Sequence, residues 1–215
     1  MEVIHRTINS KIREALNTYP VIGITGARQI GKSTEVYKFV EKGYKYISLD
    51  NIDERKLAQN DPKYFIERHG YPLIIDEVQY APIVMEVIEE IVNKNRLEQK
   101  NDKGLFILTG SQTFKLMKNV TQSMAGRAAI LYMEPLSMRE IHEETEIPFL
   151  PSEPLMKKSI NDPLSVKELF QQIIQGFYPE LYSNPLLTSE MFYARYVATY
   201  IDRDIDELLE VKNKK

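Results

Sequence analysis

The residues best suited to chemistry form the run Gly26-Ala-Arg-Gln-Ile-Gly-Lys-Ser33, which fits the pattern G-x-x-x-x-G-K-[ST] at every fixed position. Glycine permits backbone angles that aim successive N–H groups at phosphate oxygens, and a following helix N-terminus adds partial positive charge. Lys32 suits the β- and γ-phosphates, and the Ser33 hydroxyl suits Mg²⁺. We therefore predict a phosphate-binding loop formed by Gly26, Ala27, Arg28, Gln29, Ile30, Gly31, Lys32, Ser33 and Thr34.

A pair of acids follows the apolar run Leu73-Ile74-Ile75. Asp76 is expected at the end of a buried strand, where its carboxylate can hold Mg²⁺ opposite Ser33. Glu77 is one residue further on and is placed to orient or deprotonate an attacking water. Two acids after a core strand are common in isolation, but together with the loop they predict a metal ligand in Asp76 and a catalytic residue in Glu77.

Three further residues are candidates for contacting the γ-phosphate. Ser111 follows the run GLFILT, and its hydroxyl either senses the phosphate, with Thr109 beside it, or caps the next helix. Arg127 is the candidate arginine finger, and a structural ion pair is its alternative. Arg28 lies inside the loop, where contact with phosphate and pairing with a neighbouring acid are equal alternatives.

The elements that must position these residues follow from the spacing of apolar side chains. Five short apolar runs predict buried strands at 21–25, 44–49, 72–76, 104–109 and 128–133. Amphipathic patterns predict helices at 3–16, 32–41 and 82–96, and a helix over 51–69 that breaks near Asp61-Pro62. This alternation predicts an α/β fold, a parallel sheet with helices on both faces. With the run at 104–109 between the loop-bearing and acid-bearing strands, the predicted strand order is 2-3-4-1-5.

The sequence changes character after Glu134. Residues 135–145 have the pattern of one short acidic helix, prolines then cluster between Pro148 and Pro163, and residues 164–174 and 187–211 have helical patterns. We therefore predict a nucleotide-binding core over 1–145, a proline-rich linker over 146–163, and a helical tail over 164–215. The tail is either a lid or the start of a C-terminal domain.

Composition limits the classes of function. Of the 215 residues, 43% are hydrophobic and 27% are charged, the net charge is −3, and cysteine is absent. Such a charge creates no general attraction for nucleic acid, and no nucleic-acid-binding motif is present. No run approaches the ~20 apolar residues that span a bilayer. The sequence therefore predicts a cytoplasmic protein that has no membrane segment and no evident nucleic-acid partner.

Taken together, the motifs resemble those of AAA-like P-loop ATPases of bacteria and archaea that carry a C-terminal domain of unknown function. The shared motifs are the loop read as G-[PA]-R-Q-[VI]-G-K-[ST], Ile74-Ile-Asp-Glu-Val-Gln79, Leu108-Thr-Gly-Ser111, Ala125-Gly-Arg127 and Glu134-Pro-Leu-Ser137. Later, Gly176-Phe-Tyr-Pro-Glu180 resembles G-G-[YF]-P-E, and Tyr200-Ile-Asp-Arg-Asp-Ile205 resembles Y-[IL]-x-R-D-[IL]. The resemblance implies an AAA-type core with ATP and Mg²⁺. Such proteins usually continue for a further domain, so a short or truncated member is expected.

Two functions remain open on this basis. One is Mg²⁺-dependent hydrolysis of ATP, with Lys32 and Ser33 holding the triphosphate, Asp76 the metal and Glu77 the water. The other is a slowly hydrolysing ATP/ADP switch in a signalling or defence system. ATP is preferred to GTP because Asn93-Lys-Asn-Arg96 has arginine where a guanine-reading NKxD motif needs aspartate. A homo-oligomer is the expected assembly if the arginine finger comes from a second subunit.

Overall fold

The computed structural model describes residues 4–98, 100–110, 124, 126–144 and 164–201. The chain divides into two compact units. One unit is Arg6–Glu134, and the other joins Met1–His5 to Pro135–Lys215.

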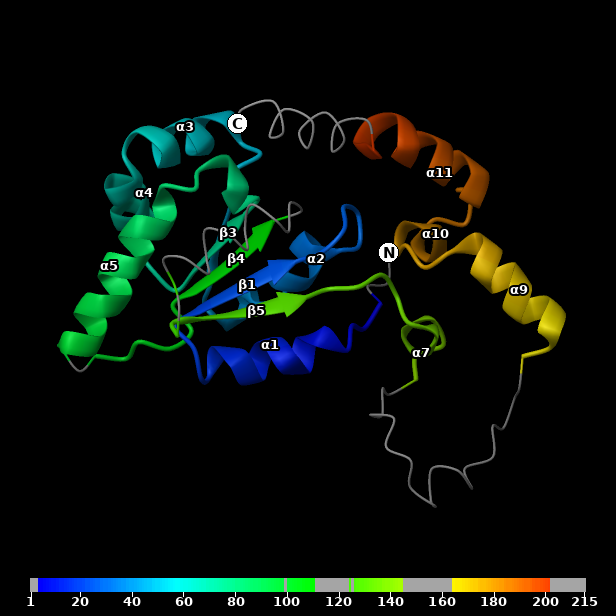
Figure 1. The fold of residues 1–215 in the computed structure, drawn as a ribbon, viewed down its shortest axis with the longest axis horizontal. Coiled ribbons are helices and arrows are strands. Elements are labelled where there is room, and N and C mark those ends of the chain that lie inside the picture. Colours follow the sequence, from blue (N-terminus) through cyan, green and yellow to red (C-terminus); the bar gives the residue numbers. More distant parts are fainter. Residues whose placement is uncertain (1–3, 99, 111–123, 125, 145–163, 202–215) are drawn as a thin grey trace, which may run out of the picture. The chain divides into compact units, whose positions relative to one another are not determined.

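The first unit contains a five-stranded sheet in the order β2-β3-β4-β1-β5 (Figure 1). Its strands are β1 (Val21–Thr25), β2 (Lys45–Ser48), β3 (Leu73–Asp76), β4 (Phe106–Gly110) and β5 (Ala128–Tyr132). All neighbouring pairs are parallel. The predicted α/β class and strand order are therefore confirmed, and the five strands lie within one or two residues of the predicted ranges.

One helix precedes β1, and further helices connect strands β1 to β4, as parallel pairing requires. They are α1 (Ile8–Leu16), α2 (Lys32–Tyr37), η1 (Val40–Lys42), α3 (Ile52–Asn60), α4 (Pro62–His69), η2 (Val78–Tyr80) and α5 (Val84–Leu97). The predicted break at Asp61-Pro62 is present, since Asp61 caps Tyr64 N–H and Pro62 occupies the first turn of α4. The helix predicted over 32–41 is wrong in length. It ends at Tyr37, and a 3₁₀ turn then closes on Gly43, whose φ of 91° stops any helix.

The two faces of the sheet are buried by different helices because side chains alternate along each strand. Leu73, Ile75, Phe106 and Leu108 belong to one core cluster with residues of α3, α4 and α5. The intervening side chains, such as Ile74, point to the other face, and β1 and β4 there contact α1 and α2. Figure 1 shows α3, α4 and α5 grouped together and α1 lying along β1 and β5.

The described part of the second unit is helical. It contains α7 (Met138–Ile141), α9 (Val166–Gln175), α10 (Glu180–Ser183), α11 (Ser189–Tyr196) and the π-helical turn η3 (Val197–Ile201). Capping boxes at Ser137 and Ser165 begin α7 and α9. The acidic helix predicted over 135–145 is reduced to α7. The predicted linker at 146–163 and the tail beyond 201 lie outside the described residues.

An aromatic cluster organises the end of this unit. The ring of Tyr178 lies 4.9 Å from that of Phe192, and both pack with Tyr193 and Tyr196.

Among the described helices of the whole chain, none is both long enough and apolar enough to cross a membrane.

We expect Leu108→Ala to lower the free energy of unfolding by about 2–5 kcal/mol, because it leaves a cavity under the central strand of a close-packed core. Leu97→Ala removes the same atoms from a side chain that is 86% exposed. It should change stability by less than about 0.5 kcal/mol. Urea unfolding of the two variants measures both values, and equal losses would contradict the described core.

Candidate nucleotide site

The predicted phosphate loop connects β1 to α2 and depends on two glycines with positive φ. Gly26 has φ 149° and Gly31 has φ 92°, angles that other residues rarely adopt. A Cβ atom on Gly26 would lie 2.1 Å from the carbonyl oxygen of Met133, so the loop also passes too close to the end of β5 for any side chain. The glycines of the motif are therefore explained by this local geometry.

Lys32 folds into the loop that it follows. Its side chain is buried, and its ammonium group donates hydrogen bonds to the carbonyl oxygens of Gly26 (3.0 Å) and Ala27 (2.6 Å). Burial lowers the pKa of Lys32 to about 8, although the nearby carboxylates of Glu77 and Asp76 act in the opposite direction. The guanidinium of Arg28 contributes to the lowering, which places Arg28 in the same electrostatic neighbourhood. The loop, the two acids and Arg28 therefore converge on one ammonium group.

Asp76 is held by hydroxyl groups from three directions. Ser33 Oγ donates to its Oδ1 at 3.1 Å, Tyr46 OH donates to its Oδ2 at 2.6 Å, and Thr109 Oγ1 also donates to Oδ1. Burial first, and then the hydrogen bond to Asp76, raise the pKa of Tyr46, which keeps the phenol protonated as a donor. Because Asp76 is only 3% exposed, these contacts replace the water that its carboxylate would otherwise bind.

The register of the sheet brings these groups together. Ser48 pairs with Asp76 and Ile75 pairs with Leu108, so Thr109 lies beside Asp76 at the carboxyl edge of β3 and β4. Strand β4 lies between β3 and β1, so at the carboxyl ends of these strands a gap of roughly 9–10 Å separates the acid-bearing strand from the loop-bearing strand. Ser33, at the start of α2, crosses this gap.

The donor set at this gap fits Mg²⁺. Ser33 and Asp76 present hard oxygen ligands within hydrogen-bond distance of each other. Mg²⁺ is commonly held by one or two protein oxygens together with phosphate oxygens and water. In the described part of the chain, no group of three or more His, Asp or Glu side chains is arranged to hold a metal by itself.

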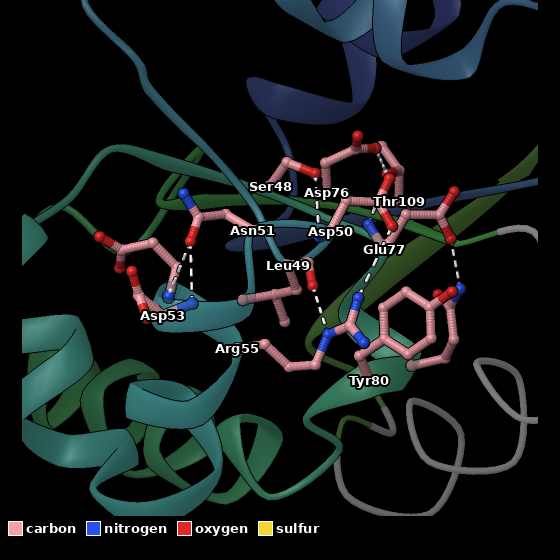
Figure 2. Close-up of polar contacts among 12 residues, drawn as sticks. Ser48, Leu49, Asp50, Asn51, Asp53, Arg55, Asp76, Glu77, Tyr80 and Thr109 are labelled. Carbon is pink, nitrogen blue, oxygen red and sulfur yellow. Dashed lines mark hydrogen bonds and ion pairs between the residues drawn. The ribbon is translucent and has the colours of Figure 1, made fainter.

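Glu77 turns sharply out of the sheet. Its backbone is left-handed, with φ 57° and ψ 43°, a conformation that is uncommon for a residue other than glycine. Its N–H donates to Thr109 Oγ1 at 3.3 Å, and its carboxylate accepts a hydrogen bond from Gln79 Nε2. Figure 2 shows Asp76, Glu77 and Thr109 together at the ends of their strands. The left-handed turn ends β3 directly after Asp76, so Glu77 does not continue the alternation of the strand.

The structure brings together most, but not all, of the residues predicted for the site. The loop residues, Asp76 and Glu77 share one edge of the sheet, and Thr34 is exposed on α2. Thr109, the neighbour considered beside Ser111, contacts Asp76 directly. Ser111 itself lies outside the described residues.

Arg127 lies at the opposite edge of the sheet. It precedes Ala128, which pairs with Val21 at the start of β1, so it lies roughly 13 Å along the strands from the loop. Its Nε donates to Asn93 Oδ1 at 2.8 Å, and its Nη1 lies 3.3 Å from Glu89 Oε1, both on α5. The structure therefore does not bring Arg127 into the site of its own chain.

Sequence reasoning missed three residues that shape the site. Tyr46 and Gln79 contact the two carboxylates, as described above. Arg6 is buried and donates to the carbonyl oxygens of Ile30 (2.7 Å) and Glu134 (2.6 Å), which ties the loop to the end of the unit. Only Gln79 belonged to a recognisable motif, and no spacing rule pointed to Tyr46 or Arg6.

Comparison with known proteins gives consistent results. A family model described as an AAA domain matches residues 18–142. Two uncharacterised proteins, Rv2008c of Mycobacterium tuberculosis and Mb2031c of Mycobacterium bovis, are each 27% identical over 144 residues. The match covers 66% of this chain and 31% of theirs, so the chain matches about a third of the length of these curated relatives.

A solved structure has the same fold. The Walker-type ATPase PABY2304 of Pyrococcus abyssi superposes with a TM-score of 0.53 at 15% sequence identity. The alignment covers 99% of this chain and 77% of that chain. At this identity the likeness concerns the fold alone.

We expect affinity for ATP to fall as pH rises above about 8, because phosphate binding favours a charged Lys32 whose pKa is lowered to about 8. At high pH a neutral Lys32 must take up a proton when ATP binds, which weakens the affinity. Below that pH the ammonium is already charged and affinity is flat, whereas above it Kd rises by up to about tenfold per pH unit. Calorimetry between pH 6.5 and 9.5 measures the slope.

Lys32→Arg is the matched control for this pH dependence, since a guanidinium stays charged throughout the range. Its affinity is expected to be weaker but nearly independent of pH. The same slope in both proteins would assign the pH dependence to another group.

Proposed function

The chain belongs to the AAA-domain family, and we propose that its site binds ATP with Mg²⁺ and hydrolyses the bond between the β- and γ-phosphates. The observation that carries this proposal is the contact between Ser33 and Asp76 across the gap left by β4. It joins the end of the phosphate loop to the acid-bearing strand, and the buried Lys32 is hydrogen-bonded to the loop beside this contact. Binding of ATP requires only the phosphate loop. Hydrolysis also requires the two acids, Asp76 for the metal and Glu77 for the water.

Each residue has a distinct task in this mechanism. Lys32 exchanges its two carbonyl acceptors in the loop for phosphate oxygens, so that its charge offsets the charge of the triphosphate. Ser33 and Asp76 hold Mg²⁺, which when bound neutralises phosphate charge. Glu77 orients water and accepts its proton as the water oxygen bonds to the γ-phosphorus and the bond to the β-phosphate oxygen breaks. The products are ADP and inorganic phosphate.

Three features support Glu77 as the residue that activates water. Its carboxylate is near enough to Lys32 to oppose the lowering of the pKa of that ammonium, so it belongs to the charged groups around the loop. Its backbone is fixed by Thr109 and by the buried Val78 that follows it. Asp76 is already engaged by three hydroxyls, which leaves Glu77 as the second acid for the proton.

We expect Lys32→Ala to lose most affinity for ATP, and Glu77→Gln to keep affinity but lose turnover by roughly a hundredfold or more, since an amide keeps the shape without the base. Calorimetry gives the affinities and phosphate release gives the rates. Unchanged binding by Lys32→Ala would contradict the loop assignment. Equal and very slow phosphate release by wild type and Glu77→Gln would instead identify a slowly hydrolysing ATP/ADP switch.

We also propose that Arg127 acts on the site of a second copy of the chain. Phosphoryl transfer builds negative charge that an arginine can stabilise, and Arg127 is too far from its own loop to do so. The contacts with Glu89 and Asn93 hold its guanidinium on α5, at the edge of the sheet away from the loop. A homo-oligomer that places this edge against the next loop would complete the site.

Arg127→Ala should then lower turnover more than affinity for ATP. Mixing it with Glu77→Gln protein should restore part of the rate, because some interfaces regain both an intact glutamate and an intact arginine. Phosphate release by the two proteins, separately and mixed, measures the effect. If mixing restores nothing and Arg127→Ala melts at a lower temperature, the residue only stabilises α5 through Glu89 and Asn93.

A further inference from the structure

We propose that Gln79 is a second hydrogen-bond partner of the attacking water, and that it acts together with Glu77. This inference rests on the proposed hydrolysis. The observation behind it is that Gln79 Nε2 donates to the Glu77 carboxylate, while Gln79 Oε1 is buried and accepts no hydrogen bond from any residue that the structure describes. The amide nitrogen is therefore hydrogen-bonded, whereas the amide oxygen can still accept a hydrogen bond.

The orientation of the amide follows from chemistry. A carboxylate is only an acceptor when ionised, so the NH₂ end of Gln79 must face Glu77 and the oxygen must point away. A flipped amide would set two acceptors against each other. The unsatisfied oxygen is therefore a consequence of the Glu77 contact and independent of how the amide was assigned.

A buried acceptor without a partner is unfavourable, and native structures rarely keep one without a reason. The donor that would satisfy it must reach a point close to the Glu77 carboxylate, because both heteroatoms of the amide lie on one carbon. Water has two O–H groups and can donate one to Glu77 and the other to Gln79 Oε1. Held in this way, its lone pair is free to attack phosphorus.

The turn that carries Gln79, η2, is held by two side chains of α3. Arg55 of α3 lies over the ring of Tyr80 at 3.9 Å and donates to the carbonyl oxygen of Leu49 at 2.6 Å (Figure 2). Gln59 Nε2 donates to the carbonyl oxygen of Tyr80 at 2.6 Å. These contacts anchor η2 without touching Glu77, so the amide of Gln79 is presented from a rigid turn.

The step remains balanced with this addition. The water oxygen bonds to the γ-phosphorus, the bond from that phosphorus to the β-phosphate oxygen breaks, and one water proton moves to Glu77. Gln79 accepts only a hydrogen bond from the other O–H and undergoes no chemical change. Its contribution is to restrict the water to one orientation.

The test compares Gln79→Met with Gln59→Met. Methionine keeps the length of glutamine but loses the donor and the acceptor. We expect Gln79→Met to lower kcat roughly tenfold to a hundredfold, the range expected for losing a hydrogen bond to a charged group, with KM for ATP unchanged. Gln59→Met removes one anchor of the same turn but leaves the Gln79 amide and the Arg55 contact with Tyr80 in place, so it should lower kcat much less than Gln79→Met does. In the Glu77→Gln background, Gln79→Met should cause no further loss.

A second measurement does not depend on turnover. Affinity for ADP with Mg²⁺ is compared in the presence and absence of aluminium fluoride, which imitates the transferring phosphoryl group and retains the attacking water. Wild type and Gln59→Met should bind the fluoride complex more tightly than ADP alone, and Gln79→Met should lose that tightening while binding ADP normally.

The outcomes separate this inference from the proposed function. If Gln79→Met keeps both kcat and the tightening, or if Gln59→Met loses them equally, Gln79 has no special role and the hydrolysis still stands. If wild type binds ATP but shows neither turnover nor tightening, the proposed hydrolysis fails and this inference fails with it.

Discussion

The rest of the site depends on the anchoring of one buried carboxylate, that of Asp76. An ionised acid in a nearly dry position is costly unless it is fully hydrogen-bonded. Here the donors come from β2 (Tyr46), β4 (Thr109) and α2 (Ser33). The two neighbouring strands and the start of α2 must therefore be aligned with the end of β3, and the observed register of the sheet provides the alignment of the strands. The requirement to satisfy one acid thus helps to set the alignment of the strands that carry the loop and Glu77.

The sequence predicted those parts of the fold that buried strands and fixed motifs encode. The three inner strands, β1, β3 and β4, are buried along their whole length and appear as continuous apolar runs, and the half-exposed edge strands β2 and β5 still have enough apolar residues to be located. The loop and the acid pair indicated the strand order. Contacts between neighbouring strands have no such signature. Tyr46 reaches Asp76 because β2 and β3 happen to be adjacent, and nothing in the local sequence of β2 reveals its partner. The apolar pattern also continued beyond Tyr37 into η1, so it did not reveal where α2 ends.

The position of Arg127 follows a simple rule of parallel sheets. Residues that follow strands gather at one edge, and residues that precede strands gather at the other. Asp76 is the last residue of β3, Glu77 and Ser33 come after strands, and Arg127 precedes β5. An arginine in that place cannot complete the site of its own chain without leaving the sheet. The motif was visible in the sequence, but in the structure its arginine contacts Asn93 and Glu89 of α5 and lies away from the loop of its own chain.

The charges around Lys32 explain how the site can remain stable without a ligand and still favour phosphate. Two carboxylates and Arg28 act on a buried ammonium whose pKa is lowered to about 8, and its protons are directed to two carbonyls of the loop. The free protein therefore keeps this charge satisfied, at the cost of partial desolvation. Phosphate oxygens replace neutral acceptors by charged ones, which strengthens each hydrogen bond of Lys32. Because Glu77 belongs to the same group of charges, the residue that would receive the water's proton lies within the electrostatic field that the nucleotide changes.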